Sequence, residues 1–416
     1  MTLNDLFSFV FYYPLFMAFL WMFGAIYYRL HWENIGGKDY TKPQKLAEYP
    51  FVSMLVPCHN EAANVEETIN ALLAQDWPDF EVIAVNDAST DDTGAILERL
   101  AAKNPRLRVI HLATNQGKAT GLNTAALVAR GEYLVCVDAD AVPEPTATHW
   151  MISNFLAAPR VGAVTGNPRI RNRTTMIAKI QVGEFSSIIG LIRRAQRIYG
   201  RVFTVSGVVS AYRKTALQQV GWWRNDTATE DIDISWRLQL KHWDIHYEPK
   251  AMSWILMPET LRGIWRQRLR WAQGGAEAFG RYFRDLFHWK SRRMWGVAIE
   301  YVAGVAWAVL LATGVLLWLA GKFATLPAAL QVPSLLPAWQ GSVLALVCLL
   351  QFFVSLAIDS RYERGLMRDY FWIVWYPMAF WVINVFTVVT GVPKAILHRR
   401  HGKAVWESPD RGAHKA

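Results

Sequence analysis

The chain has 416 residues, a net charge of +10 and a hydrophobic content of 52%. That hydrophobic share is high for a wholly soluble protein, and the apolar residues gather in a few long runs, so an entirely soluble fold is excluded. The three cysteines form no CxxC pair and no Cys/His metal spacing, which argues against a zinc site and against a disulfide framework.

The first long apolar run covers residues 6–28 and contains no charged residue. As a helix it reaches roughly 34 Å, enough to cross a hydrocarbon core of about 30 Å. A signal peptide is the alternative, but the leader MTLND has no basic residue, the run is too long, and no small-x-small cleavage site follows it. The pattern therefore predicts a retained membrane anchor.

Residues 31–258 alternate short apolar runs with helical patterns. Between the first two runs, Val65, Ile69 and Leu72 recur at helical spacing. Continuous apolar strands separated by helices indicate a parallel sheet covered on both faces, in an α/β domain of nucleotide-binding type. Neither GxGxxG nor a P-loop is present, which argues against a dinucleotide fold and a Walker NTPase. The expected strands are 51–58, 81–87, 108–113, 132–140 and 161–166.

Polar residues follow several of these strands, at the edge where such sheets bind ligands. In the stretch VDAD, Asp138 and Asp140 alternate along an expected strand, so both are predicted to point into one crevice. Two such carboxylates can share a cation, and Mg²⁺ typically takes one or two carboxylates together with phosphate oxygens. A turn or a helix cap is the alternative interpretation.

Two further residues near this edge have both a structural and a binding interpretation. Asp87 follows the buried stretch EVIAV, and it is either an Asx-turn or N-cap for the next helix or an acceptor for a nucleotide base or ribose. Lys118 stands between glycines before an expected helix. It is either solvated or in contact with a phosphate or a base.

The stretch TATEDIDISWRLQL, residues 227–240, places an acidic cluster ahead of an apolar-periodic run. Thr229 suits an N-cap, and Glu230 and Asp231 suit the positive end of a helix dipole. Composition alone favours capping over chemistry here.

The stretch WRQRLRWAQGG, residues 265–275, combines three arginines with two tryptophans. In a helix Gln267, Arg270 and Trp271 share one face. An interfacial helix with snorkelling side chains is one interpretation. Guanidinium groups that pair with phosphate, and tryptophan that stacks on sugars, are the other.

Three more apolar runs follow, at 296–320 (which contains Glu300), 342–358 and 370–392. The basic residues beside the runs fit the positive-inside rule better than nucleic-acid binding and predict a cytoplasmic insert. One crossing before the insert and three after it would put the basic tail outside, against the same rule. Either one C-terminal segment is re-entrant or paired, or the tail is an exception. The basic residues are Arg29, His31, Lys290, Arg292, Arg293, Lys394, Arg399 and Arg400.

The chain is thus expected to have five parts, taken in order: an N-terminal anchor, a soluble domain, an amphipathic interfacial segment, C-terminal membrane helices and a basic tail. Their boundaries are 1–30, 31–258, 259–294, 295–393 and 394–416.

Four of these stretches together resemble a known family. Asp87, DAD at 138–140, TED at 229–231 and QRLRW at 267–271 match in order and spacing the D, DxD, TED and QxxRW motifs of processive family 2 glycosyltransferases. That family includes cellulose, chitin and hyaluronan synthases. Longer stretches, among them VGAVTGNPRIRNRTT and WESPDRG, look like its bacterial members that polymerise N-acetylglucosamine through β-1,6 linkages. Some of those members have two N-terminal spans where this chain has one.

The resemblance implies a fold, a substrate and roles for individual residues. It implies a nucleotide-sugar-binding domain of GT-A type, with a Rossmann-like, mostly parallel sheet inserted between transmembrane helices. This domain would make an inverting, UDP-N-acetylglucosamine-dependent polymerase. The residues implied to bind uridine diphosphate are Glu61, Asp87 and Lys118, and those implied to bind the nucleotide and Mg²⁺ or Mn²⁺ are Asp138 and Asp140. The implied general base is Asp231, with Glu230 beside it. The residues implied to line the acceptor end are Gln267, Arg270 and Trp271, of which Arg270 stabilises the leaving diphosphate.

The resemblance also implies a setting. The enzyme would be a multi-pass protein of the bacterial inner membrane that contacts lipid and works with a small two-span membrane subunit in making biofilm polysaccharide. The growing polymer would pass through the spans, with Glu300 and tryptophan-rich helices lining its route. A synthase of chitin-like or hyaluronan-like polymer is the alternative within the family, and a non-catalytic nucleotide-sensing receptor is the alternative outside it.

Overall fold

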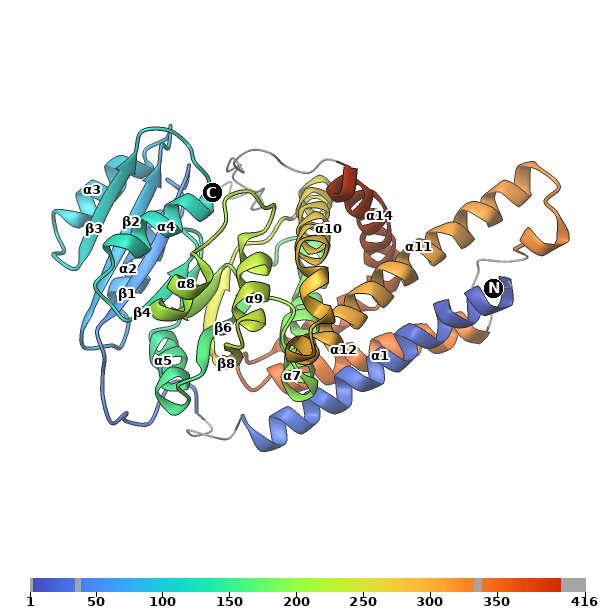
Figure 1. Ribbon diagram of the computed structural model, residues 1–416, viewed down its shortest axis with the longest axis horizontal. Coiled ribbons are helices and arrows are strands. Elements are labelled where there is room, and N and C mark those ends of the chain that lie inside the picture. Colours follow the sequence, from blue (N-terminus) through green and yellow to red (C-terminus); the bar gives the residue numbers. More distant parts are fainter. Residues whose placement is uncertain (1–2, 34–38, 333–338, 398–416) are drawn as a thin grey trace.

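The computed structural model describes residues 3–33, 39–332 and 339–397. A sheet-centred domain lies at one end of the molecule, and long helices extend from it toward the other end (Figure 1). The stretch WESPDRG, Arg399, Arg400 and most of the expected basic tail lie outside the described residues.

One eight-stranded sheet forms the centre of the soluble domain, in the order β3-β2-β1-β4-β7-β6-β8-β5. Strands β3, β2, β1 and β4 are mutually parallel, as predicted. The antiparallel β7 lies between β4 and β6, and β5 pairs antiparallel with β8, so the sheet is mostly parallel rather than wholly so. The strands are β1 (Val52–Cys58), β2 (Phe80–Asp87), β3 (Leu107–Leu112), β4 (Tyr133–Val137), β5 (Val142–Pro143), β6 (Val161–Ile170), β7 (Val209–Arg213) and β8 (Asp244–Ile255).

Helices cover both faces of this sheet because its central strands are apolar on both sides. In β1, Met54 packs in the same cluster as Ile69 of α2, whereas the neighbouring Leu55 packs with Leu122 of α4 on the opposite face. The helices of this domain are α2 (Val65–Leu73), α3 (Thr93–Ala101), α4 (Lys118–Val128), α5 (Ala147–Ala157), α8 (Lys214–Val220) and α9 (Glu230–Leu240).

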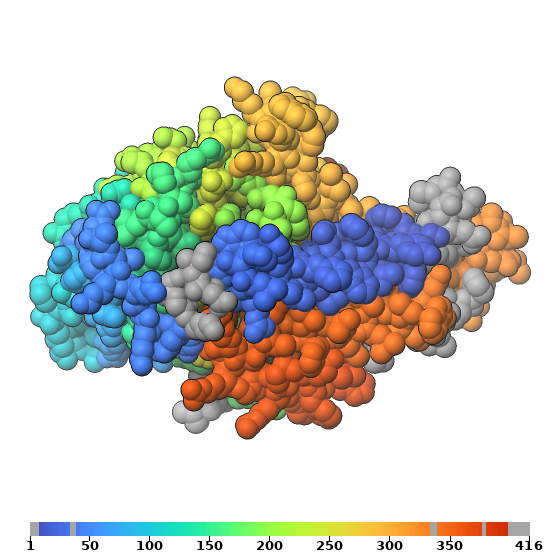
Figure 2. Space-filling view, turned by 90° about the horizontal axis from the view of Figure 1, so that it is seen from below, coloured from blue at the N-terminus to red at the C-terminus, as the bar shows by residue number. Residues whose placement is uncertain are grey.

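Among the residues that the structure describes, four helices are long and apolar enough to cross a membrane. They are α1 (Leu3–His31), α11 (Trp295–Phe323), α12 (Trp339–Asp359) and α14 (Tyr376–Leu397). The run expected at 370–392 is divided: α13 (Tyr370–Ile373) ends before α14 begins, and the apolar span covers Phe380–Leu397. Figure 2 shows α1 and α12 side by side along one face, where they pack together.

Between the sheet and these helices lie segments that connect the two parts. One continuous helical stretch contains α6 (Met176–Phe185), a π-helix η1 (Ser186–Ile192) and α7 (Arg193–Tyr199). The long amphipathic α10 (Leu261–Tyr282) packs against α9 and α14. The short 3-10 segments are η2 (Phe283–Phe287), η3 (Trp289–Met294), η4 (Ala328–Leu330) and η5 (Leu366–Asp369).

A buried ionic network joins the sheet to the membrane helices. Asp359, at the end of α12, accepts from Arg194 of α7 at 2.9 Å and from Arg169 of β6 at 2.7 Å. Arg194 also pairs with Glu33, just after α1, and Arg169 with Glu363 at 3.0 Å. Elements far apart in the chain are thus held by charges that water does not reach.

Candidate active site

The predicted site residues gather where the carboxyl ends of β1, β2 and β4 meet the starts of α4 and α9. The acidic residues come from the strand ends and from the first turn of α9. Lys118, the first residue of α4, lies among them. The predicted residues of the QRLRW stretch are on α10, which approaches from the side of the membrane helices (Figure 1).

Asp138 and Asp140 lie in a turn and not on a strand, which corrects the prediction from alternation. β4 ends at Val137, where its pairing with Val209 of β7 stops, and the Ala141 amide then donates to the Asp138 carbonyl at 3.0 Å. The two carboxyls are still close enough to interact. Burial raises the pKa of Asp138 to about 6, with the Lys118 charge opposing the shift and the Asp140 charge adding to it.

Lys118 contacts both acidic motifs, DAD at 138–140 and TED at 229–231. Its Nζ lies 2.5 Å from Asp138 Oδ1 and 3.2 Å from Glu230 Oε1, and it donates to the Gly207 carbonyl at 3.1 Å. Burial alone would lower the pKa of Lys118, but the Asp138 and Glu230 charges outweigh it and raise that pKa. The interpretation of Lys118 as a solvated surface lysine is therefore wrong.

Asp231 stands in the first turn of α9 and faces the same loop. Its Oδ2 accepts from the Gly207 amide at 3.3 Å, and its Oδ1 from the Ile232 amide at 2.9 Å. Burial and the neighbouring Glu230 charge raise its pKa, although Lys118 and Arg270 pull the other way. A half-buried carboxylate with a raised pKa is chemically suited to accept a proton near neutral pH.

The helix-cap interpretation of this stretch is only partly right. Thr229 occupies the N-cap position of α9, but its side chain makes no capping hydrogen bond. A Cβ added at Gly274 of α10 would lie 1.9 Å from Thr229 Oγ1, so only glycine permits α10 to approach the TED motif this closely.

Asp233, two residues after Asp231, has a different environment. It is buried, and it accepts from the Tyr282 hydroxyl at 2.7 Å and from Arg237 Nε at 2.7 Å. These contacts attach α9 to the end of α10 and leave Asp233 with a structural role.

Asp87 is fully buried and holds the loop before α4. Its two carboxylate oxygens accept from the amides of Gln116 and Gly117, each at 2.8 Å. Gly117 has φ +85°, a left-handed conformation that glycine adopts at low cost. The N-cap position of α3 is Asp92, so the interpretation of Asp87 as its cap is wrong. Asp87 instead holds the loop before α4 through the two amides.

Glu61, after β1, is buried close to the same edge. Its amide donates to Thr93 Oγ1 at 2.7 Å, and Asn64 Nδ2 lies 3.5 Å from its Oε2. His59 was assigned no role from the sequence; its Nδ1 lies 2.7 Å from the Asp87 carbonyl oxygen, so it links the ends of β1 and β2.

The QRLRW stretch forms one and a half turns of α10, as its spacing predicts. Arg270 is exposed, and its charge acts to lower the pKa of both Glu230 and Asp231. Trp271 is half-buried, with the Arg268 guanidinium 4.2 Å above its ring, and Gln267 Nε2 lies 4.0 Å from the Met257 sulfur. Gln267, Arg270 and Trp271 thus lie on the side of α10 that borders the acidic cluster and the sheet.

Arg268 in the same stretch is buried and anchors α10. It pairs with Glu184 of α6, which also accepts from the Tyr376 hydroxyl of α14 at 3.3 Å. This arginine does not snorkel, because its charge is neutralised inside the protein.

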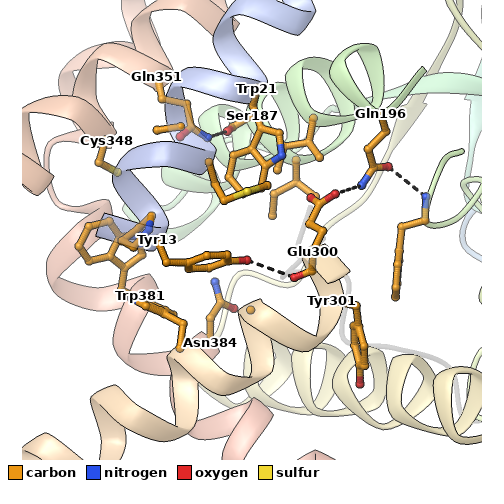
Figure 3. Close-up of a pocket in the computed structure, with 18 of the residues that line it drawn as sticks. Tyr13, Trp21, Ser187, Gln196, Glu300, Tyr301, Cys348, Gln351, Trp381 and Asn384 are labelled. Carbon is orange, nitrogen blue, oxygen red and sulfur yellow. Dashed lines mark hydrogen bonds between the residues drawn. The ribbon is translucent and has the colours of Figure 1, made fainter. Parts of the chain in front are cut away.

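A cavity of about 490 Å³ lies between α1, η1, α11, α12 and α14. In Figure 3, Tyr13, Trp21, Tyr301 and Trp381 are among the aromatic residues around it. Its polar wall is formed by Glu300, which accepts from Tyr199 at 2.6 Å and from Gln196 at 3.1 Å.

The cavity and the acidic cluster share one loop. Phe203 and Thr204 line the cavity, and Gly207, three residues later, contacts both Lys118 and Asp231. The longer stretch QRIYGRVFTVSGVVSAYR belongs to the resemblance, but nothing local in RVFTVSG indicates that its backbone meets residues from α4 and α9.

The donor set suits a divalent cation that arrives with a phosphate ligand. Asp138 and Asp140 offer carboxylate oxygens, and Mg²⁺ keeps several waters and binds through one or two carboxylates plus substrate phosphates. Within residues 3–33, 39–332 and 339–397, no group of three or more His, Cys, Asp or Glu side chains could hold a metal by itself. The residues present therefore fit a metal that the nucleotide helps to bind.

Comparison with known proteins places this geometry in a family. Residues 53–221 match the family model described as glycosyl transferase family 2. A poly-beta-1,6-N-acetyl-D-glucosamine synthase of Staphylococcus epidermidis is 38% identical over 98% of both chains, and one of Staphylococcus aureus strain COL is 37% identical over 98% of both. A mannosyltransferase from Pyrobaculum calidifontis, solved in complex with GDP-Man and Mn²⁺, shares the fold with a TM-score of 0.64 at 21% identity, over 95% of this chain and 99% of its own.

Proposed function

Because this chain belongs to the poly-β-1,6-N-acetyl-D-glucosamine synthases of glycosyltransferase family 2, we propose that the cluster around Lys118 and Asp231 is where it adds each sugar. The enzyme is a glycosyltransferase that polymerises N-acetylglucosamine from a nucleotide-sugar donor into a polysaccharide. One observation carries the assignment of the site. The Gly207 carbonyl accepts from Lys118 and the Gly207 amide donates to Asp231, so one residue links the lysine beside the DAD motif to the carboxylate of the TED motif.

Asp231 acts as the general base in this proposal. It removes the proton from the acceptor hydroxyl as that oxygen attacks the anomeric carbon of the donor. A single displacement with one base inverts an α-linked donor to a β-linked product and needs no covalent intermediate. Glu230 is kept ionised by Lys118, and its charge keeps Asp231 basic.

The donor side holds the uridine diphosphate of UDP-N-acetylglucosamine. Asp87 fixes the loop that carries Lys118, and Glu61 lies beside it at the end of β1. Asp138 and Asp140 would hold Mg²⁺ or Mn²⁺, which when bound neutralises charge that develops on the diphosphate.

The acceptor side is formed by α10. Arg270 is exposed toward the acidic cluster, where its charge stabilises the departing diphosphate. Trp271 offers an indole face for the terminal sugar, and Gln267 lies one turn before it as a hydrogen-bonding group.

The polymer leaves through the cavity between the membrane helices. Its aromatic walls suit sugar rings, and its Glu300 cluster suits hydroxyl groups. Phe203 and Thr204, which line it, belong to the loop that contacts the site through Gly207. Export across the bacterial inner membrane would then be coupled to synthesis, with the sheet domain in the cytoplasm and the polymer destined for the biofilm matrix.

The surroundings of the membrane helices fit a lipid contact and a small two-span membrane subunit. Phe16 and Phe23 of α1, Leu316 of α11 and Leu346 of α12 are each more than 60% exposed. Such side chains need an apolar neighbour.

The substrate and linkage are tested with membranes that contain the enzyme and radiolabelled UDP-N-acetylglucosamine. We expect a labelled polymer that a β-1,6-specific hydrolase digests and chitinase does not. A chitinase-sensitive polymer would identify the chitin-like alternative, and a requirement for UDP-glucuronic acid would identify the hyaluronan-like one. A membrane preparation that binds UDP but makes no polymer under any donor would favour the receptor alternative.

The raised pKa of Asp231 predicts the acid limb of the pH profile. Asp231 works only when deprotonated, so kcat/KM is full above its raised pKa and is lost as the pH falls through it, at higher pH than an ordinary aspartate near 4 would give. Burial and the Glu230 charge both raise this pKa, and Glu230→Gln removes the second of these causes, so the limb should move to lower pH even as the rate falls. Binding of UDP with metal over the same pH range is the control, because it reports Asp138 separately. A limb that stays unmoved in Glu230→Gln would contradict the assignment.

A further inference from the structure

The Lys118 ammonium lies where two acidic motifs come together. It is 2.5 Å from Asp138 Oδ1 and 3.2 Å from Glu230 Oε1, with its side chain only 18% exposed. Both partners are themselves mostly buried, with side chains 22% and 14% exposed. In this arrangement one positive charge is shared by a carboxylate of the DAD motif and a carboxylate of the TED motif.

This position conflicts with metal binding at Asp138. A divalent cation held by Asp138 would be close to the ammonium that already contacts its Oδ1, and two positive charges at that distance repel strongly in a poorly solvated site. Since no described group of three or more ligands compensates for this repulsion, the protein alone offers a weak metal site.

The nucleotide diphosphate resolves the conflict because it gives Lys118 another acceptor. The backbone of Lys118 is fixed, since Asp87 holds the Gly117 amide at 2.8 Å. The side chain has a flexible four-carbon stem with three donors and can change partner without moving α4. Phosphate oxygens would draw the ammonium away from Asp138 and supply further ligands for the cation.

We propose that Lys118 is an internal counter-ion that makes metal binding by Asp138 and Asp140 conditional on the nucleotide. This rests on the proposed function for the assignment of those two carboxylates. With no nucleotide, Lys118 keeps the motifs together and keeps the divalent cation out. When the diphosphate arrives, Lys118 transfers to it, and the metal and the nucleotide bind as one unit.

The test measures Mn²⁺ binding by electron paramagnetic resonance of free Mn²⁺, on the full-length enzyme in nanodiscs, with and without UDP. In the wild type, we expect UDP to tighten Mn²⁺ binding by about tenfold or more, within the range of ordinary coupling between sites. Lys118→Met should tighten Mn²⁺ binding without nucleotide by about tenfold and should reduce the effect of UDP to about threefold or less. Lys118→Arg keeps the charge and should behave as the wild type.

Lys103→Met is the matched control, because it removes an exposed lysine after α3 and should leave both affinities unchanged. Thermal unfolding of each variant verifies folding, and Lys118→Ala repeats the test if Lys118→Met is not stable. One outcome would overturn this inference and leave the metal assignment standing. In it, the wild type and the charge-removing variants bind Mn²⁺ equally well without nucleotide, and UDP strengthens binding in both. Absence of Mn²⁺ binding in every variant even with UDP would overturn the metal assignment and this inference with it.

Discussion

Asp231→Asn is expected to lower polymer synthesis by roughly 10²–10⁴-fold, the usual contribution of a general base. The amide keeps the size of the carboxylate and can still accept from the Ile232 amide, so the first turn of α9 should persist. It cannot take the proton from the acceptor hydroxyl. The measurement is incorporation of labelled N-acetylglucosamine at saturating donor, together with the affinity for UDP, which should change little.

Asp233→Asn is the matched control for this prediction. It makes the same chemical change two residues later, where the carboxylate accepts from Tyr282 and Arg237 and does not face the cluster. Its effect should appear as lower thermal stability rather than as a loss of turnover per folded molecule. Polymer synthesis that survives in Asp231→Asn would remove Asp231 as the base, and equal losses of turnover in both variants would assign both acids to structure.

Local patterns were sufficient to predict the first half of the sheet. The runs at β1, β2 and β4 are buried, mostly apolar and separated by helical segments, and parallel pairing of β1 with β2 and β4 follows from that alternation. The placement of Asp87, Asp138 and Asp140 near one edge followed from the same topology, whereas Lys118 and the TED motif were assigned to the site by the resemblance to the family.

The second half of the sheet depends on pairing that no local pattern specifies. β7 is five residues long and enters between β4 and β6 from a loop that first packs beside the membrane helices. β4 ends at Val137 because the chain turns at Asp138, whose carbonyl accepts from the Ala141 amide, and this turn is why the alternation argument for Asp138 and Asp140 was wrong. The contacts of Lys118 were beyond prediction for the same reason, since they join residues from three separate elements.

Buried charges were the other feature that the sequence concealed. Arg194 and Arg268 look like surface or interfacial residues in a basic, membrane-adjacent chain, yet both are buried in ion pairs. Asp359 ends an apolar run, where an acid normally marks the return to water. Only the three-dimensional structure places these charges against one another.

Asp359→Ala is expected to destabilise the protein by about 3–5 kcal/mol, because it removes the buried carboxylate that two buried guanidinium groups share and leaves N–H donors of both without that acceptor. Asp359 accepts from both Arg169 and Arg194, and its side chain is wholly buried. The two arginines keep Glu363 and Glu33, so one carboxylate charge fewer would face the same two guanidinium groups. The measurement is thermal or denaturant unfolding of the purified protein in detergent, followed by synthesis per folded molecule.

Ser360→Ala, the adjacent control, loses only a hydrogen bond to the Ala357 carbonyl and should cost about 1 kcal/mol or less. Gly190→Ala tests the network without touching its charges. A Cβ at Gly190 in the π-helix would lie 2.6 Å from Asp359 Oδ2 and 3.0 Å from Arg194 Nη1, so it should push the pair apart and destabilise the protein in the same direction. Unfolding of Asp359→Ala at the same midpoint as Ser360→Ala would mean that the network is not what holds the membrane helices to the sheet. The geometry argues otherwise, because these ion pairs join β6, α7, the end of α12 and Glu33, just after α1, in one buried network.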